Sequence, residues 1–130
     1  MESDEAKKIL IVEDDEDYRD LLRQKLESIG IAVLSAGNGR VALDILKENK
    51  IDLILLDLIM PEMDGITFCY KLQHTLNSST PIIIMTNLTE AAYPADVRDF
   101  IIKANVGLDE VVKKVEANLS PPIDKVEIKV

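Results

Sequence analysis

The stretch from Ile51 to Gly65, IDLILLDLIMPEMDG, limits the possible folds of this chain more than any other segment. Residues 53–56 form a continuous apolar run of strand length, and Asp57 follows it at once. Such a run is typical of a strand buried on both faces, although periodicity alone would also allow a buried helix. The run is short, and Pro61 and Gly65 interrupt the sequence soon after it. We therefore predict a central strand with Asp57 at its carboxyl end, where open α/β sheets build their sites.

Short apolar runs and amphipathic segments alternate along the rest of the chain. The predicted strands are residues 8–12, 31–36, 52–56, 82–86 and 100–102. Helical spacing of apolar residues follows the first, second, third and fifth of these strands, whereas residues 87–99 have the weakest pattern. Asn38 and Asp64 stand where helix caps are expected. The repeat of strand and helix predicts a three-layer α/β/α sandwich around a five-stranded parallel sheet.

The composition fits one domain and argues against several classes of protein. The chain has 130 residues, and 47% of them are apolar, which is enough for a core without disulfides. Its only cysteine, Cys69, excludes an internal disulfide and suits a reducing compartment. A formal net charge of −9 disfavours direct binding to nucleic acid. No apolar run is long enough to span a membrane and the N-terminus is acidic, so we expect a cytoplasmic protein.

Polar residues stand at the carboxyl ends of four predicted strands. In chain order they are Glu13 and Asp14, then Asp57, Thr86 and Lys103. The carboxyl ends of parallel strands lie along one edge of a sheet, so three carboxylates, a hydroxyl and an ammonium are expected to meet there. Crowded carboxylates favour a hard divalent cation, and Mg²⁺ takes few protein oxygens. The sequence thus predicts a Mg²⁺ site, and such an ion could present a phosphoryl group to a carboxylate nucleophile.

Four motifs at these strand ends resemble the receiver domain of two-component response regulators, the CheY-like family. They are ILIVEDD at residues 9–15, LLDLIMPEMDG at 55–65, IIMT at 83–86 and FIIK at 100–103. One such motif would be a weak signal, but four in this order are specific, and the resemblance extends from about residue 8 to 119. It implies a flavodoxin-like sheet with the strand order 2-1-3-4-5.

The resemblance also implies roles for individual residues. The phosphoacceptor is Asp57. The implied ligands of Mg²⁺ are Glu13, Asp14, Asp57 and the backbone carbonyl of Ile59. Three further residues are implied to respond to the phosphoryl group: Thr86 as the switch hydroxyl, Phe100 as the switch aromatic residue and Lys103 as the phosphoryl-binding cation.

The implied activity is that of a signalling switch and not of an ordinary enzyme. The phosphoryl donor is expected to be a histidine kinase or a histidine phosphotransfer protein, and the domain would assist its own phosphorylation and dephosphorylation. The signal would pass to a downstream protein or to an output domain absent from this sequence. We expect residues 1–7 to be a polar lead-in, residues 8–119 to be the receiver domain and residues 120–130 to be a tail or the start of a linker.

The sequence departs from the family pattern in three ways. Ala104 follows Lys103 where the family usually has proline, so we expect the loop of Lys103 to be trans and differently aimed. Asn87 follows Thr86 where the family prefers a small residue, and it would either crowd the site or supply a hydrogen bond. The interval between Thr86 and Lys103 is short by more than a helical turn. We therefore expect the helix within residues 87–99 to be shortened or irregular, and its coupling to the output to be altered.

These departures leave a second function open, that of a receiver-like interaction domain that keeps the acidic residues but is not normally phosphorylated. A third, weaker alternative is a hydrolase of the haloacid type, which also uses an aspartate nucleophile. That class requires a second aspartate two residues after the first, and Ile59 stands at that position here.

Overall fold

Five parallel strands form the central sheet. They are β1 (Lys8–Val12), β2 (Ala32–Ala36), β3 (Leu53–Leu56), β4 (Ile82–Thr86) and β5 (Asp99–Ile102). Their spatial order is β2-β1-β3-β4-β5, which confirms the predicted fold class and strand order. The computed structural model describes residues 6–59, 63–74, 80–87 and 97–119. The predicted central strand, which precedes Asp57, is indeed the middle strand of the sheet.

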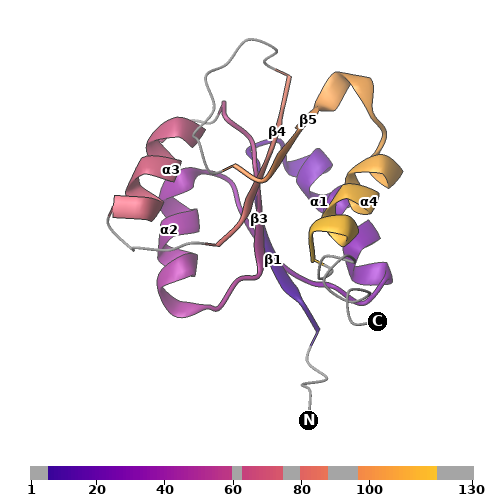
Figure 1. Ribbon diagram of the computed structural model, residues 1–130, viewed down its shortest axis with the longest axis horizontal. Helices are drawn as coiled ribbons and strands as arrows, with labels where there is room; N and C mark the ends of the chain where they lie inside the picture. Colours follow the sequence, from indigo (N-terminus) through magenta and orange to yellow (C-terminus); the bar gives the residue numbers. More distant parts are fainter. Residues whose placement is uncertain (1–5, 60–62, 75–79, 88–96, 120–130) are drawn as a thin grey trace, which may run out of the picture.

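Helices cover both faces of the sheet (Figure 1). α1 (Glu16–Ser28) and α4 (Leu108–Leu119) lie on one face, and α2 (Gly39–Glu48) and α3 (Gly65–His74) lie on the other. A short 3₁₀ helix, η1 (Lys103–Asn105), directly follows β5. This arrangement is the three-layer sandwich that the alternation of strands and helices predicts.

Strands β1 and β3 supply side chains to both halves of the core. Strand residues alternate between the two faces, so Leu10 and Val12 pack toward α2 and α3, whereas Ile9 and Ile11 pack toward α1 and α4. The residues of β3 are likewise fully buried. Helix side chains that complete the two halves include Ala42, Phe68 and Leu72 on one side and Leu22, Leu26, Val111 and Val115 on the other. Burial on both faces explains the continuous apolar runs in the sequence.

Side-chain caps determine where three helices begin. In each helix an Oδ1 atom accepts a hydrogen bond from a backbone N–H three residues later. The pairs are Asp15 with Tyr18 at 3.1 Å, Asn38 with Val41 at 2.9 Å, and Asp64 with Thr67 at 2.8 Å. Each cap satisfies a donor that has no partner within the first helical turn. The predicted caps at Asn38 and Asp64 are confirmed. The cap at Asp15 starts α1 directly after the acidic pair Glu13 and Asp14.

Gly65 allows α3 to begin close to the backbone of Asp57 and Leu58. A Cβ atom at position 65 would lie 2.7 Å from Leu58 Cα and 2.9 Å from Asp57 O, closer than Cβ atoms approach other atoms in proteins. The Gly65 N–H donates a hydrogen bond to Leu58 O at 2.9 Å. Because only glycine fits here, this residue ties the start of α3 to the chain just after β3.

Two apolar positions of α1 differ from the prediction. The apolar spacing after the first strand predicts a helix face that includes Leu21, Leu22, Leu26 and Ile29, but Leu21 and Ile29 are 51% and 46% exposed. The helix contacts the sheet through a narrower stripe that contains the fully buried residues Leu22 and Leu26. Leu21 lies about a quarter of a turn away from that stripe, and Ile29 is the cap residue beyond the last helical turn.

Other sequence predictions concern parts of the chain outside the described residues. The expected shortening of the helix within residues 87–99 falls mainly on 88–96, and the expected tail falls on 120–130; neither segment is described.

Strand β5 begins at Asp99, one residue before the predicted start. Within the ranges that the structure describes, no helix combines the length and apolar character needed to cross a membrane.

Candidate functional site

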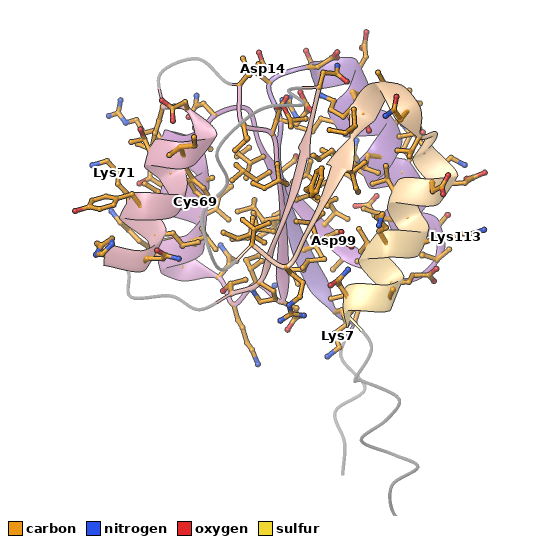
Figure 2. The ribbon with its side chains drawn as sticks, turned by 45° about the horizontal axis from the view of Figure 1, so that its top comes forward. Lys7, Asp14, Cys69, Lys71, Asp99 and Lys113 are labelled. Atoms are coloured by element: carbon orange, nitrogen blue, oxygen red, sulfur yellow. The ribbon has the colours of Figure 1, made fainter. Side chains whose placement is uncertain are left out.

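The sheet register places polar residues from distant parts of the chain at one edge. Val12 pairs with Leu56, so Glu13 and Asp57 both follow the last paired residues of β1 and β3. The Asp57 N–H extends this ladder by donating to Val12 O at 3.0 Å. Figure 2 shows Asp14 at this edge and Lys7, which precedes β1, at the opposite end of the sheet. The predicted convergence of strand ends is therefore present.

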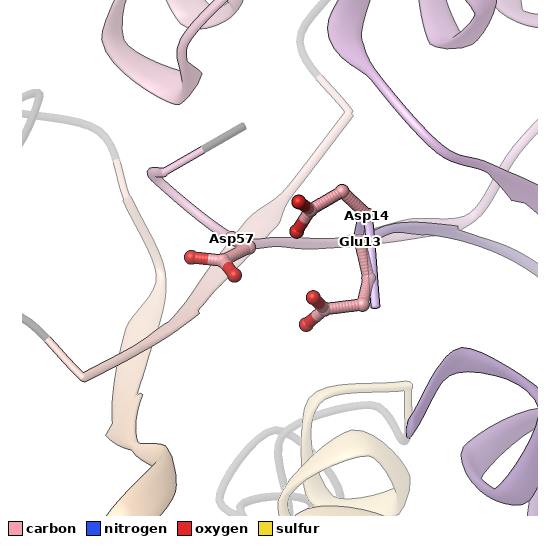
Figure 3. Close-up of side chains that lie close together, drawn as sticks. All are labelled: Glu13, Asp14 and Asp57. Carbon is pink, nitrogen blue, oxygen red and sulfur yellow. The ribbon is translucent and has the colours of Figure 1, made fainter. Parts of the chain in front are cut away.

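Three carboxylates share a small space at this edge. Glu13, Asp14 and Asp57 each place a carboxylate oxygen within 4.8 Å of the others. Figure 3 shows Glu13 and Asp14, which follow β1, beside Asp57, which follows β3. Glu13 is 1% exposed and Asp57 is 6% exposed, whereas Asp14 faces solvent. The cluster is thus walled by protein on one side and open to a solute on the other.

Lys103 neutralises part of this charge. Its Nζ donates a hydrogen bond to Glu13 Oε1 at 2.6 Å and another to Asp57 Oδ2 at 3.2 Å. The Tyr18 ring lies beside the same ammonium, with its centroid 4.7 Å from Nζ. The Lys103 ammonium therefore reaches the cluster although Ala104 replaces the proline that is usual in the family. The described peptide bonds are all trans, as expected, and the ammonium still reaches Asp57.

Burial and neighbouring charges shift two titratable groups of the cluster. Burial raises the pKa of Glu13, and the charge of Asp57 adds to this effect, although hydrogen bonds from Lys103 and the Asp15 N–H oppose it. Burial alone would lower the pKa of Lys103, but its hydrogen bond to Glu13 and the negative charges of Asp57 and Glu13 raise it overall. Lys103 therefore remains an ammonium at neutral pH and is held between two carboxylates.

Backbone donors orient the two buried carboxylates. The Asp15 N–H donates to Glu13 Oε2 at 3.0 Å, and the Ile59 N–H donates to Asp57 Oδ1 at 3.1 Å. Arg19 Nη1 donates to the Glu13 backbone carbonyl at 2.8 Å and so fastens α1 to the end of β1. Among the described residues, no buried side-chain nitrogen or oxygen lacks a hydrogen-bond partner. The cluster is therefore preorganised.

The cluster suits a divalent cation with oxygen ligands. Three carboxylates and one ammonium leave two negative charges uncompensated among these four groups. A carboxylate has about four acceptor positions. The hydrogen bonds to Glu13 and Asp57 therefore leave each group further lone pairs for a cation. Hard ions such as Mg²⁺ prefer such oxygen donors.

The remaining predicted site residues lie near this edge. Thr86 is completely buried at the end of β4, and it pairs with Ile102, the residue before Lys103. Phe100 lies on the outer strand β5 and is 46% exposed. Ile59 contributes its N–H to Asp57, and its side chain is 56% exposed. The switching roles of Thr86 and Phe100 and the ligand role of the Ile59 carbonyl stay predictions.

Asn87 supplies a hydrogen bond, which is one of the two possibilities that the sequence left open. Its Oδ1 accepts from the Ala104 N–H at 2.7 Å. Tyr18 and Arg19 also contact the site, although the sequence motifs do not include them. The sequence feature that could have indicated their role is their position in the first turn of α1, directly after the acidic residues.

Comparison with known proteins identifies the family. The family model described as "Response regulator receiver domain" matches residues 9–116. The chain is 36% identical over 110 residues to "Probable transcriptional regulator ycf27" of Porphyridium aerugineum, a match that covers 85% of this chain and 42% of that protein. This chain thus spans less than half the length of that curated relative.

Solved structures agree with this match. A two-component response regulator from Clostridium difficile has a TM-score of 0.78 and 34% identity, with 87% of this chain and 95% of that chain covered. The response regulator protein TrrA from Thermotoga maritima, in complex with Mg(2+)-BeF, has a TM-score of 0.75 and 27% identity, with 87% and 99% covered. The chain belongs to the response regulator receiver domain family.

Proposed function

We propose that this receiver domain accepts a phosphoryl group on Asp57 in a Mg²⁺-dependent reaction and thereby changes its affinity for a partner. The observation that supports this most strongly is the position of the Asp57 carboxylate. It lies within 4.8 Å of the Glu13 and Asp14 carboxylates and 3.2 Å from the Lys103 ammonium. Phosphoryl transfer depends mainly on such positioning and charge neutralisation.

The chemistry requires one bond to form and one to break. A carboxylate oxygen of Asp57 attacks the phosphorus atom of the donor, and the bond to the leaving group breaks with its electron pair passing to that group. The Ile59 N–H and Lys103 hold the attacking carboxylate in one orientation. Lys103 would then donate hydrogen bonds to oxygens of the bound phosphoryl group.

Mg²⁺ would be held by the carboxylates of Glu13, Asp14 and Asp57 and by the backbone carbonyl of Ile59. When bound, the ion neutralises negative charge on the transferring phosphoryl group. The protein contributes the orientation of the ligands, because Glu13 is fixed by the Asp15 N–H and Asp57 by the Ile59 N–H.

The phosphoryl group would act as a switch. It adds negative charge and acceptor oxygens at Asp57, and the Thr86 hydroxyl would donate a hydrogen bond to one of them. Phe100 would then repack, and the face around β5 and α4 would change its preference for a partner. A shift from mostly inactive to mostly active requires a free-energy difference of about 5.5 kcal/mol between the two states.

The proposed phosphoryl donor is a histidine kinase or a histidine phosphotransfer protein. The receiver of the phosphoryl signal is either a separate downstream protein or an output domain on a longer chain. The relatives described as transcriptional regulators support the second arrangement, since this chain matches less than half of their length. The acidic character of the present chain disfavours direct binding of this domain to nucleic acid.

Intact-mass spectrometry after incubation with a small phosphodonor tests the proposal. In the presence of Mg²⁺ the wild type should gain one phosphoryl group, and chelation of Mg²⁺ should prevent the gain. Asp57→Asn should abolish it. Asp52→Asn is the matched control, because Asp52 stands at the other end of β3 and accepts a hydrogen bond from the Lys8 N–H at 2.8 Å. No gain in the wild type would instead support an interaction domain that is not phosphorylated.

A further inference from the structure

We infer that Asn87 is a positioning residue that holds the Lys103 loop in place for phosphoryl transfer, an inference that rests on the proposed function. Asn87 Oδ1 accepts a hydrogen bond from the Ala104 N–H at 2.7 Å. A backbone N–H can only donate, so the accepting atom must be the carboxamide oxygen. The bond therefore joins the residue after Thr86 to the residue after Lys103.

This hydrogen bond continues the ladder between β4 and β5. Thr86 and Ile102 are the last residues that pair in the two strands. Beyond Ile102 the chain turns into η1, and its backbone no longer runs as a strand. The Asn87 side chain supplies the next bond in place of a backbone carbonyl. The peptide bond between Lys103 and Ala104 is consequently held relative to the end of β4.

Lys103 is then constrained at both ends. Its ammonium contacts Glu13 and Asp57 and lies 4.7 Å from the centroid of the Tyr18 ring. The peptide unit that follows its Cα is bonded to Asn87. A lysine side chain is long and loses much rotamer freedom when it is ordered. Anchoring the backbone limits the positions from which the ammonium can approach Asp57, and so favours the orientation that transfer requires.

Two of the departures from the family pattern account for each other. A proline at position 104 would have no N–H, and Asn87 would lose its partner. An alanine or glycine at position 87 would have no side-chain oxygen to accept the Ala104 N–H. In this chain the hydrogen bond that the Ala104 N–H donates to the Asn87 side chain therefore replaces the rigidity that a proline ring would give the Lys103 loop.

Nuclear magnetic resonance of the unphosphorylated protein tests the anchor directly. In Asn87→Ala, exchange of the Ala104 amide hydrogen should accelerate up to about tenfold, the effect of losing one hydrogen bond. The nuclear Overhauser effect between the Lys103 ε-methylene and the Tyr18 ring should weaken. Asn87→Asp is the matched control, because its carboxylate also accepts the Ala104 N–H and should preserve both signals. Unchanged signals in Asn87→Ala would overturn the inference.

The rate of phosphorylation by a small phosphodonor tests the consequence. Asn87→Ala should slow it by roughly three- to tenfold, in line with the loss of one hydrogen bond. The same substitution should have no further effect in a Lys103→Met background, because Asn87 acts through Lys103. A faster rate, or an equal slowing in both backgrounds, would show that Asn87 acts on the phosphoryl pocket directly and would overturn the inference. If the wild type is not phosphorylated, the proposed function fails, whereas the resonance experiment still decides the inference.

Discussion

The Lys103 ammonium donates a 2.6 Å hydrogen bond to Oε1 of Glu13, a residue that lies 90 positions earlier in the chain. Glu13 is almost completely buried, and its second oxygen accepts the Asp15 N–H. The same lysine lies 3.2 Å from Asp57. One side chain thus links Glu13 to the proposed phosphoacceptor, so changes at Lys103 should affect both stability and phosphorylation.

Replacing Lys103 by methionine should destabilise the protein. The substitution keeps an unbranched side chain of similar length but leaves Glu13 and Asp57 without their cation. Removing one partner of a buried ion pair costs about 3 kcal/mol or more, and urea unfolding in the presence of a chelator measures the change. Added Mg²⁺ should restore part of the lost stability.

The control for that experiment is Lys25→Met. Lys25 also forms a 2.8 Å ion pair, with Asp109, but both side chains are exposed. Exposed pairs contribute little to stability, so this variant should unfold nearly as the wild type does. Equal losses in the two variants would show that the burial of the Lys103 pair is not what stabilises the site.

The raised pKa of Glu13 predicts a pH-dependent effect of Glu13→Gln. Burial and then the Asp57 charge raise this pKa above its ordinary value of 4.5. The stabilising contribution of the protonated group is complete below that value and is lost as pH rises through the raised pKa. The wild type should therefore lose stability between pH 4.5 and the raised pKa, whereas Glu13→Gln, which does not titrate, should not. In the presence of a chelator, the free energy of unfolding of the variant minus that of the wild type should increase as the pH rises through this range. A difference independent of pH would contradict the assignment.

Magnesium should stabilise the wild type more than it stabilises Glu13→Gln at neutral pH. The wild type gains about 2.7 kcal/mol when the concentration of Mg²⁺ is a hundred times its dissociation constant. Glu13→Gln has lost one carboxylate of the cluster, so it should gain less at the same concentration. Thermal unfolding with and without Mg²⁺ measures the two gains, and equal gains would exclude Glu13 as a ligand.

Gly65→Ala should disturb the chain next to the phosphoacceptor. The added Cβ would lie 2.7 Å from Leu58 Cα, a backbone atom that cannot simply rotate away. Overpacking of this kind costs about 1–3 kcal/mol, and it should also slow phosphorylation because Asp57 would move. Gly107→Ala is the control: a Cβ there meets nothing within 4 Å, and the change in stability should stay within about 1 kcal/mol.

The Tyr18 ring should stabilise the protein through the Lys103 ammonium. Tyr18→Phe keeps the ring and should unfold close to the wild-type temperature. Tyr18→Leu removes the ring and should lose about 0.5–2 kcal/mol, the range for a partly buried cation–π contact. Similar losses in both variants would instead point to the Tyr18 hydroxyl, which lies 3.8 Å from Met85 Sδ.

The sequence was sufficient to predict the features that follow from the sheet. Strands buried on both faces require continuous apolar runs, and the first polar residue after each run marks the strand end. The sequence alone therefore places Glu13, Asp57 and Lys103 at one edge of the sheet. Helix caps depend on a few neighbouring residues, which is why Asn38 and Asp64 were also predictable.

Contacts between distant side chains were less predictable, because they depend on rotamers and on how closely the elements pack. The ring of Tyr18 lies beside Lys103 only because α1 packs on the face of the sheet that α4 also covers. The narrow stripe through which α1 contacts the sheet likewise leaves Leu21 exposed. The hydrogen bond of Asn87 was one of two possibilities, and the turn of the chain into η1 decides between them. The roles of Thr86 and Phe100 concern the phosphorylated protein and stay predictions.

Locating the phosphoryl group tests the central claim most directly. Protein incubated with Mg²⁺ and a small phosphodonor is treated with borohydride, which reduces an aspartyl phosphate to homoserine, and is then digested and sequenced by mass spectrometry. Homoserine should replace Asp57 in the peptide that contains residues 51–65, and only in samples with Mg²⁺. A phosphoryl group found elsewhere, for example on His74, or an unmodified Asp57 after this treatment, would contradict the account.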